Sequence, residues 1–365
     1  MARPLSFPLR RVLASSCAAT TRKTTIIHFS KRHHFIDALK LAMNTPILNA
    51  ADGAWNLLAR FGHMLGHNCA VIDGNQLRKL SLALGRRELH PGLDIKADMA
   101  DYGTALPPGY HMPYFTTGGV AEELAIDPHE VKTAAPWPFT RKMWTGGRMR
   151  WLGEDVTLEV NDYAEERIKL IGTAPGKSED GSEVVLAQIA MEVWGPKGRA
   201  ITEERSWVFH REATAPSPAA EKAMHDAVIG GPSTVKDVPR DGAYPQRHLR
   251  WSLMDLFRFS ALTLDRRVIR YDLAWSTAVE EHPTSVVHVM LLLINMLDYW
   301  RDHCLDRGLE LREIRYQVVA PVYAGETYVI SADRVRGAAG DGFLRWDLVV
   351  SKEGKTCMTG DILGM

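Results

Sequence analysis

The side chains best suited to chemistry lie in one short stretch of the chain and at one histidine beyond it. Ser260, Thr263, Asp265 and Arg270 fall within eleven positions among apolar neighbours, and His288 follows at the start of an apolar run. A carboxylate and an imidazole can exchange protons with a substrate, and histidine titrates near neutral pH. Arginine neither accepts a hydrogen bond nor gives up its proton, so Arg270 is suited to holding an anion.

The charged residues also allow a purely structural interpretation. Asp265 is either a base or a turn residue paired with Arg266 or Arg267. A nearby guanidinium would lower the pKa of Asp265 by ~1–3 units, which keeps it ionised and makes it a poorer base. Arg270 either holds an enolate, a carboxylate or a phosphate, or forms a salt bridge, for example to Asp272.

The histidine and the hydroxyl residues leave two interpretations open as well. His288 is either an acid–base group or a hydrogen-bonded residue at the entry of a helix. Ser260 and Thr263 either bond substrate oxygens or satisfy local backbone groups.

The elements around these residues indicate how they are held. Val286–Leu297 is apolar at nearly every position, and such a helix is normally wrapped by other structure. Four predicted strands follow it, over Glu310–Pro321, Glu326–Arg336, Gly342–Ser351 and Lys355–Leu363. A buried helix held by a curled antiparallel sheet is the hotdog arrangement. The first turn of that helix would offer free backbone N–H groups.

The first half of the chain follows a similar order of elements. Its predicted strands are Lys142–Trp151, Asp155–Asp162, Glu166–Thr173, Val184–Trp194 and Ala200–Phe209. Their short spacing indicates an antiparallel sheet, because parallel pairs need longer crossovers. Together with the family resemblance given below, this order of elements predicts an α+β double hotdog, with two antiparallel sheets, each with a central helix, in one chain. The first unit with its helical lead-in covers residues 37–211, a Pro- and Gly-containing linker covers 212–245, and the second unit covers 246–365.

The amino terminus differs from the rest of the chain. Residues 1–36 contain seven Lys or Arg, no Asp or Glu, and many Ser and Thr. This pattern is typical of a mitochondrial transit peptide, and the alternative is a disordered basic tail. Because the whole chain has a formal net charge of zero, the remainder is acidic. An acidic body disfavours nucleic acid as a partner, and no apolar run is long enough to suggest a membrane span.

The cysteine and histidine spacing does not indicate a metal site. The four cysteines are far apart, without a C-x-x-C pair, which is typical of reduced thiols. His63 and His67 have the spacing of a helical zinc pair but lack the adjacent glutamate and an obvious third ligand. We therefore expect neither a metal nor a cofactor.

Three segments of the chain resemble a known family. Phe257–Asp272 is similar to F-R-x-S-A-L-T-F-N-x-H-R-I-H-Y-D, a signature of the fungal mitochondrial 3-hydroxyacyl-thioester dehydratases within the MaoC-like hydratase superfamily. Val286–Leu291 is similar to their V-V-H-G-P-L, and Arg141–Gly147 to the R-x-M-W-A-G-G of their amino-terminal half.

Several positions depart from these signatures, and three of the departures bear directly on the chemistry. Arg267 and Arg270 stand where the family carries histidine, and Val289 stands where it carries glycine. Arginine cannot complete an acid–base dyad. Val289 keeps its backbone N–H, although its branched side chain restricts how closely a thioester can approach. The resemblance therefore leaves Asp265 and His288 as the acid–base pair.

The resemblance implies a hydro-lyase for 3-hydroxyacyl or enoyl thioesters of acyl carrier protein or CoA. The pathway would be mitochondrial fatty acid synthesis or a related fungal biosynthesis. The start of the apolar helix would hold the thioester oxygen. The candidate substrate-binding residues are Arg270, Ser260, Thr263, Arg258, Val289 and Trp144. Among these, Arg258 would anchor a carrier phosphate or lie in solvent, and Trp144 would close an acyl tunnel or fill the core.

Two other functions fit the same fold. The first is a non-catalytic acyl-thioester-binding partner protein that has lost the acid–base dyad, and the second is a thioesterase. Because each half would supply one hotdog unit, the chain is expected to be a monomer with an internal pseudo-dimer, or a homodimer.

Overall fold

The computed structural model describes residues 46–62, 65–115, 136–211, 231–241, 243–265, 267–278, 280, 282–304, 309–337 and 342–365. The predicted transit peptide, His63 and residues 212–230 of the predicted linker lie outside the described residues. Among the helices in these ranges, none is long and apolar enough to cross a membrane.

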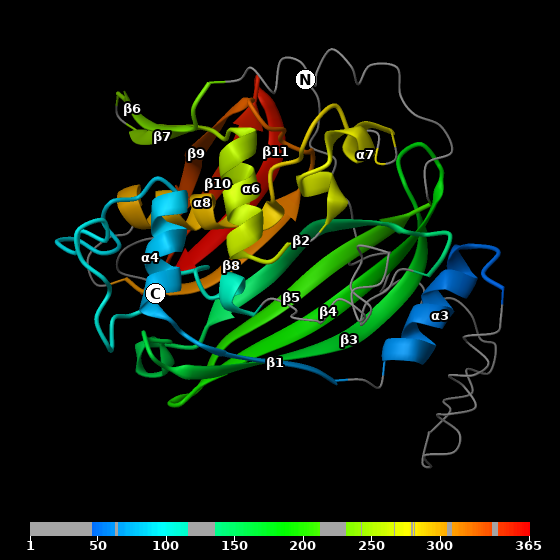
Figure 1. The fold of residues 1–365 in the computed structure, drawn as a ribbon, viewed down its shortest axis with the longest axis horizontal. Helices are drawn as coiled ribbons and strands as arrows, with labels where there is room; N and C mark the ends of the chain where they lie inside the picture. The colour runs from blue at the N-terminus through cyan, green and yellow to red at the C-terminus, as the bar shows by residue number, and fades with distance from the viewer. Residues whose placement is uncertain are drawn as a thin grey trace.

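The strands of the described residues join one antiparallel sheet in the order β1-β3-β4-β5-β2-β8-β11-β10-β9-β7-β6. They are β1 (Leu65–Val71), β2 (Arg141–Trp151), β3 (Tyr163–Lys177), β4 (Glu183–Gly195), β5 (Gly198–His210), β6 (Thr234–Arg240), β7 (Ala243–Arg250), β8 (Leu311–Val318), β9 (Thr327–Arg336), β10 (Leu344–Lys352) and β11 (Lys355–Gly364). The two predicted sheets are continuous, because β2 pairs with β8 from Gly146↔Gln317 to Arg150↔Glu313. Figure 1 shows the two halves meeting at these strands.

The carboxyl-terminal half wraps α8 (Val289–His303), and residues 291–300 of this helix are all buried. Figure 1 shows α8 between the strands β8–β11 on one side and α4 (Gly74–Ala83) and α6 (Leu253–Leu262) on the other. The wrapped apolar helix was therefore correctly predicted. It begins at Val289 rather than Val286, because Val287 N donates to Val322 O at 2.8 Å and continues the extended chain.

The amino-terminal half carries α3 (Ala50–Phe61) on one face of β3 and β4. Asn49 begins this helix, since its side chain accepts hydrogen bonds from Ala51 N and Asp52 N at 2.9 and 3.0 Å. The apolar side of α3 forms a second, smaller core with Phe139 and neighbouring strand residues. The architecture is thus an α+β double hotdog with a helix in each half.

Two predicted segments differ in the structure. Asp155–Asp162 is not a strand: it starts as the short helix η3 (Glu154–Val156), and its Val160 N donates to Thr104 O in a facing loop. Leu158 and Val160 alternate with polar residues because they pack under that loop. The predicted linker also extends too far, because β6 and the start of β7 form a hairpin within it. Every residue of β6 is exposed, so it lacks the apolar alternation that indicates a strand.

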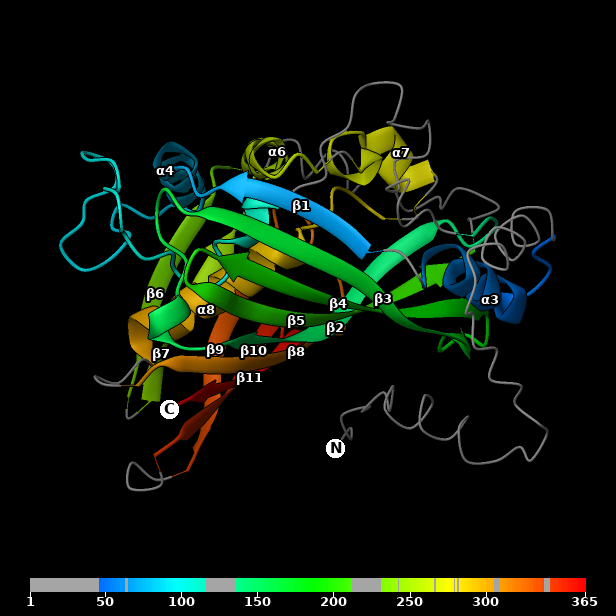
Figure 2. The same ribbon diagram turned by 90° about the horizontal axis from the view of Figure 1, so that it is seen from below.

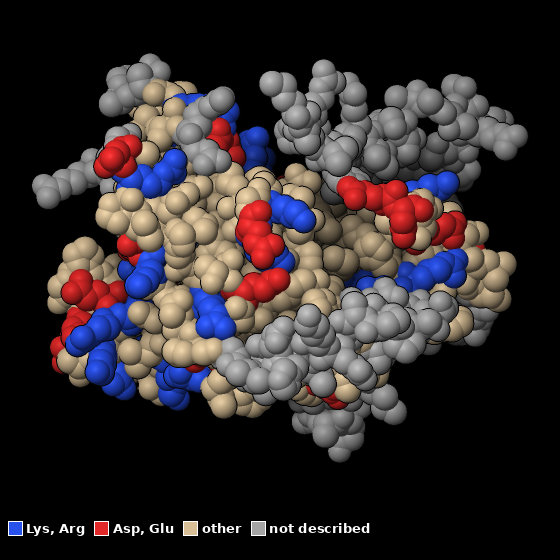
Figure 3. Space-filling model, turned by 90° about the horizontal axis from the view of Figure 1, so that it is seen from above, with Lys and Arg blue, Asp and Glu red and all other residues tan. Residues whose placement is uncertain are grey.

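Shorter helices complete the described fold, namely α7 (Leu273–Ala278), η1 (Met112–Tyr114) and η4 (Val268–Arg270). In Figure 2, α4, α6 and α7 line one side of the molecule. Basic and acidic side chains are interspersed over the described part of the surface in Figure 3.

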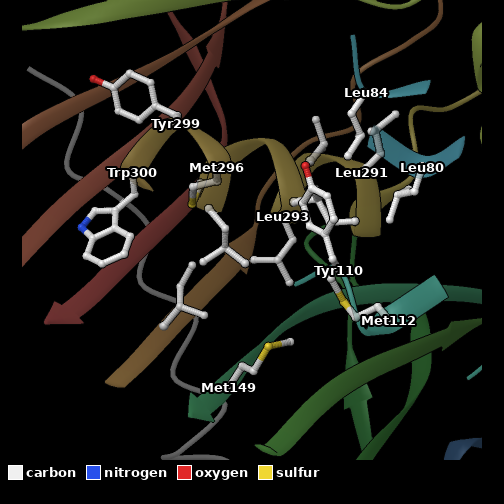
Figure 4. Close-up of a cluster of buried hydrophobic side chains, with 14 of the residues drawn as sticks. Leu80, Leu84, Tyr110, Met112, Met149, Leu291, Leu293, Met296, Tyr299 and Trp300 are labelled. Carbon is white, nitrogen blue, oxygen red and sulfur yellow. The ribbon is translucent and has the colours of Figure 1, made fainter. Parts of the chain in front are cut away.

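The main core surrounds α8. Figure 4 shows Leu80 of α4 and Leu84, the residue after this helix, packed near Leu291, with Tyr110 and Met112 beside Leu293. This packing fixes α8 on all sides, so the position of its first turn is well determined.

Candidate active site

The end of α6 places Asp265 inside the molecule. Leu264 has a positive φ of 47°, which reverses the chain, and Asp265 N donates back to Ser260 O at 2.9 Å. The side chain of Asp265 is 14% exposed. It is therefore turned inward and not into bulk water.

Asp265 lies between two guanidinium groups. Arg267 Nε donates to Asp265 Oδ1 at 2.9 Å, and Arg267 Nη2 donates to Oδ2 at 2.5 Å. Arg270 Nε donates to Oδ2 at 3.3 Å. The pairing with Arg267 was one of the structural alternatives for this carboxylate.

Arg270 is buried and bridges two segments of the site. Besides Asp265, it binds the carbonyl oxygen of Val286, two residues before His288. The alternative pairing with Asp272 is wrong, because Asp272 Oδ1 instead accepts from Trp275 N at 2.9 Å in the first turn of α7. Arg270 thus ties the short helix η4 to the strand-like entry of α8.

His288 is the residue at which α6, η4 and α8 meet. It is the N-cap of α8, and its Nε2 lies 2.9 Å from Ser260 Oγ and 3.5 Å from Asp265 Oδ2. The ring of Phe259 packs edge-on against the imidazole, with centroids 5.0 Å apart. His288 is 2% exposed, and its Nδ1 is buried without a hydrogen-bond partner among the described residues.

The charges determine the protonation states. Burial alone would raise the pKa of Asp265, but Arg267 and Arg270 outweigh it and hold that pKa well below its usual value. Burial, followed by the charge of Arg270, lowers the pKa of His288 well below its usual value. Burial and Arg267 lower the pKa of Arg270 to about 9. At neutral pH the site therefore combines a carboxylate, two cations and a neutral imidazole.

Two predicted substrate-binding residues have local partners instead. Thr263 Oγ1 donates to Phe259 O at 2.9 Å and so satisfies the end of α6. Arg258 is exposed and pairs with Asp255 at 3.1 Å on the helix surface. These contacts agree with the structural interpretation of both residues.

The other two candidates occupy different places. Val289 is the first residue of α8, directly after His288, so its N–H belongs to the unpaired first turn of the helix. Trp144 packs in another cluster on β2, with Trp207 at 5.7 Å and Tyr316 at 5.9 Å between ring centroids. The structure brings Asp265, Arg270, Ser260 and Val289 to His288 but gives Trp144 core contacts.

One feature of the site had no sequence signal. The Ser260–His288 hydrogen bond joins residues 28 positions apart on different elements. The sequence shows the types of both residues, but their contact depends on how α6 crosses the start of α8.

Solved structures of one class share this fold. A MaoC-like dehydratase superposes with a TM-score of 0.57 at 15% identity, covering 84% of this chain and 98% of that chain. A MaoC-like dehydratase from Phytophthora capsici gives a TM-score of 0.54 at 13% identity, covering 85% and 97%. The fold is that of the MaoC-like dehydratases.

The family model for hydroxyacyl-thioester dehydratase type 2 matches residues 109–324, more than half of the chain. The chain belongs to this family, which confirms the resemblance seen in its motifs.

Two curated relatives align over parts of the chain. The mesaconyl-C(4)-CoA hydratase of Chloroflexus aurantiacus is 27% identical over 203 residues, which is 54% of this chain and 65% of that protein. The mitochondrial hydroxyacyl-thioester dehydratase type 2 of Schizosaccharomyces pombe is 22% identical over 239 residues, which is 61% of this chain and 76% of that protein.

Proposed function

We propose that this protein is a hydro-lyase that interconverts 3-hydroxyacyl and enoyl thioesters by removing or adding water. The observation that carries the proposal is the convergence of Ser260 Oγ and Asp265 Oδ2 on His288 Nε2 at the start of a buried helix. The family match and the two relatives, named as a hydratase and a dehydratase, support the same chemistry.

His288 exchanges the proton with the substrate. A carboxylate near Nε2 favours the tautomer with the proton on that nitrogen, which leaves Nδ1 as an acceptor. In dehydration, Nδ1 takes a proton from the carbon next to the thioester, and the imidazolium returns it to the departing hydroxyl group. Asp265 stays ionised and stabilises the imidazolium between these steps.

The first turn of α8 holds the thioester oxygen. Val289 and Met290 follow His288 directly, and their N–H groups have no intrahelical acceptor. Negative charge that develops on the oxygen is stabilised by these donors and by the helix dipole. The proton acceptor and the oxyanion donors therefore come from consecutive residues.

A hydration assay with crotonyl-CoA tests this proposal. We expect His288→Ala to lower kcat/KM by at least about 100-fold, the usual size of a lost acid–base contribution. Asp265→Asn should also lower kcat/KM, because the imidazolium then loses its neighbouring negative charge. Thioester binding without turnover, unchanged in both variants, would instead indicate the non-catalytic binding protein. Release of free thiol would indicate a thioesterase.

We further propose a mitochondrial location and an acyl thioester of acyl carrier protein or CoA as the substrate, in fatty acid synthesis or a related biosynthesis. The acid-free basic segment at residues 1–36 supports this location, and the Schizosaccharomyces pombe relative is named mitochondrial. A fluorescent fusion with and without residues 1–36 tests the location. The described residues of the site all come from one chain, and the chain is proposed to be a monomer with an internal pseudo-dimer or a homodimer. Sedimentation of the active protein distinguishes these two states.

A further inference from the structure

Two guanidinium groups of the described site share one carboxylate. One carboxylate, that of Asp265, faces both Arg267 and Arg270. Further out, Arg141 and Glu280 balance each other at an Nε–Oε2 distance of 3.4 Å. His282 adds no charge at neutral pH, because burial, Arg141 and Arg270 lower its pKa to about 4. Two guanidinium groups thus face the single carboxylate of Asp265, near the positive end of α8.

Arg270 also has hydrogen-bonding capacity to spare. Its Nε donates to Asp265 and its Nη1 to Val286 O, whereas Nη2 has no acceptor among the residues that the structure describes. The side chain is 5% exposed. A buried cation without a full set of partners is costly, and a bound anion would complete it.

The position of this cation limits the kind of anion. Arg270 Nε and His288 Nε2 lie 3.3 and 3.5 Å from the same oxygen, Asp265 Oδ2. Arg270 and His288 therefore contact the same carboxylate oxygen. A group bound to the guanidinium lies close to the imidazole that exchanges the proton in the proposed mechanism. The phosphate groups of CoA or acyl carrier protein are distant from the reacting carbon atoms, so they do not fit a site next to the imidazole. A carboxylate on the acyl group, next to the reacting carbon atoms, does fit.

We propose that the substrate is the monothioester of a short dicarboxylic acid and that Arg270 binds its free carboxylate. This inference rests on the proposed function and names its substrate class. The carboxylate is attached to the carbon that receives the hydroxyl group. In hydration, water adds across the carbon–carbon double bond, with hydroxyl to that carbon and hydrogen to the carbon next to the thioester, and no further reactant is needed.

Binding of two non-reacting thioesters tests the carboxylate site without turnover. Succinyl-CoA and butyryl-CoA have the same chain length and differ by a carboxylate in place of a methyl group. We expect the full-length protein to bind succinyl-CoA roughly 10- to 100-fold more tightly in calorimetric titrations, the usual effect of a hydrogen bond to a charged group. Equal affinity for the two thioesters would overturn the proposal.

Variants assign the preference to Arg270. Arg270→Gln should remove the preference, and Arg270→Lys should keep part of it, because lysine retains the charge without the planar fork. Arg199→Gln, at an exposed pair with Glu192, should leave the preference unchanged. An Arg270→Gln protein that still prefers succinyl-CoA, or loses affinity equally for both thioesters, would contradict the assignment.

Turnover separates this inference from the proposed function. Fumaryl-CoA and crotonyl-CoA form the matching reactive pair, and we expect higher kcat/KM for fumaryl-CoA. Hydration of crotonyl-CoA without a preference for succinyl-CoA in binding would overturn the substrate class and leave the hydro-lyase intact. A preference for succinyl-CoA without hydration of either enoyl thioester would overturn the hydro-lyase and leave the carboxylate site intact.

Discussion

Asp265 organises the charges of the site more than it acts as a base. Each of its oxygens accepts from a guanidinium, and Arg267 and Arg270 hold its pKa well below its usual value. A carboxylate with so little proton affinity is suited to orienting His288 and stabilising its charged form. In the proposed mechanism, His288 exchanges the protons through Nδ1, which has no hydrogen-bond partner among the described residues.

Removing the carboxylate should destabilise the protein strongly. Asp265→Asn leaves two partly or fully buried guanidinium groups without their anion, for which we expect a loss of about 3–5 kcal/mol in urea unfolding at pH 7. Because the folded-state pKa of Asp265 is depressed, this stabilisation is present above about pH 4 and is lost as the pH falls further. The difference between the two proteins should therefore shrink in acid.

A matched surface pair provides the control. Glu192→Gln removes the anion from the exposed pair with Arg199, so we expect a change below about 1 kcal/mol. Equal destabilisation by Asp265→Asn and Glu192→Gln would show that Asp265 and its two arginine partners are not buried.

Ser260 should affect turnover through His288. Ser260→Ala removes the hydroxyl group 2.9 Å from Nε2 and leaves the imidazole less firmly oriented. We expect kcat to fall about tenfold with little change in KM, as for one lost hydrogen bond of about 1.4 kcal/mol. Ser81→Ala is the control, because that buried hydroxyl group has no partner among the described residues. An unchanged kcat in Ser260→Ala would argue against a positioning role.

At the scale of elements, the seam between β2 and β8 holds the two halves together. Gly146 and Gly147 lie next to Trp144 and Thr145 in β2. In the structure, a Cβ at Gly147 would collide with Glu204 O and lie 2.7 Å from the Tyr316 hydroxyl group. The glycine is needed there because β2 approaches its two neighbouring strands closely.

Because the strands approach so closely, adding one methyl group at position 147 should lower the free energy of unfolding markedly. Gly147→Ala should lower the free energy of unfolding by about 1–3 kcal/mol or more, because backbone must shift to admit it. Gly172→Ala in β3 meets nothing within 4 Å and should cost much less. Urea unfolding curves of the two variants would decide, and similar midpoints would show that the seam is looser than described.

Some helices and strands could be predicted from local sequence patterns, and others could not. The apolar run before Leu297 and the strands that follow it were predictable, because burial on all sides leaves a continuous apolar sequence. The β6–β7 hairpin was not, since β6 is exposed at every position. For the site, the residue types were predictable, but the meeting of Ser260, Asp265 and His288 was not. It depends on the turn at Leu264 and on the crossing of α6 and α8.

At the scale of the whole molecule, the continuous sheet places neutral histidines in both halves. His111 lies beside η1, His282 precedes α8 and His288 caps it. Burial, followed by nearby arginines, lowers the pKa of His111 to about 3 and that of His282 to about 4. His288 is shifted in the same direction by burial and Arg270. The fold therefore keeps all three imidazoles uncharged at neutral pH.

These histidines should make the protein sensitive to mild acid. In the unfolded chain each takes up a proton as the pH falls through about 6.5, whereas the folded chain resists it, so stability is lost below that pH. Each histidine contributes at most about 1.4 kcal/mol per pH unit, which makes at most about 4 kcal/mol per pH unit for these three. Urea unfolding at pH 7, 6 and 5 would measure this loss. His111→Asn, which is remote from His288, should lower this slope by at most about 1.4 kcal/mol per pH unit. A slope that is the same with and without His111 would mean that this imidazole is already protonated in the folded protein.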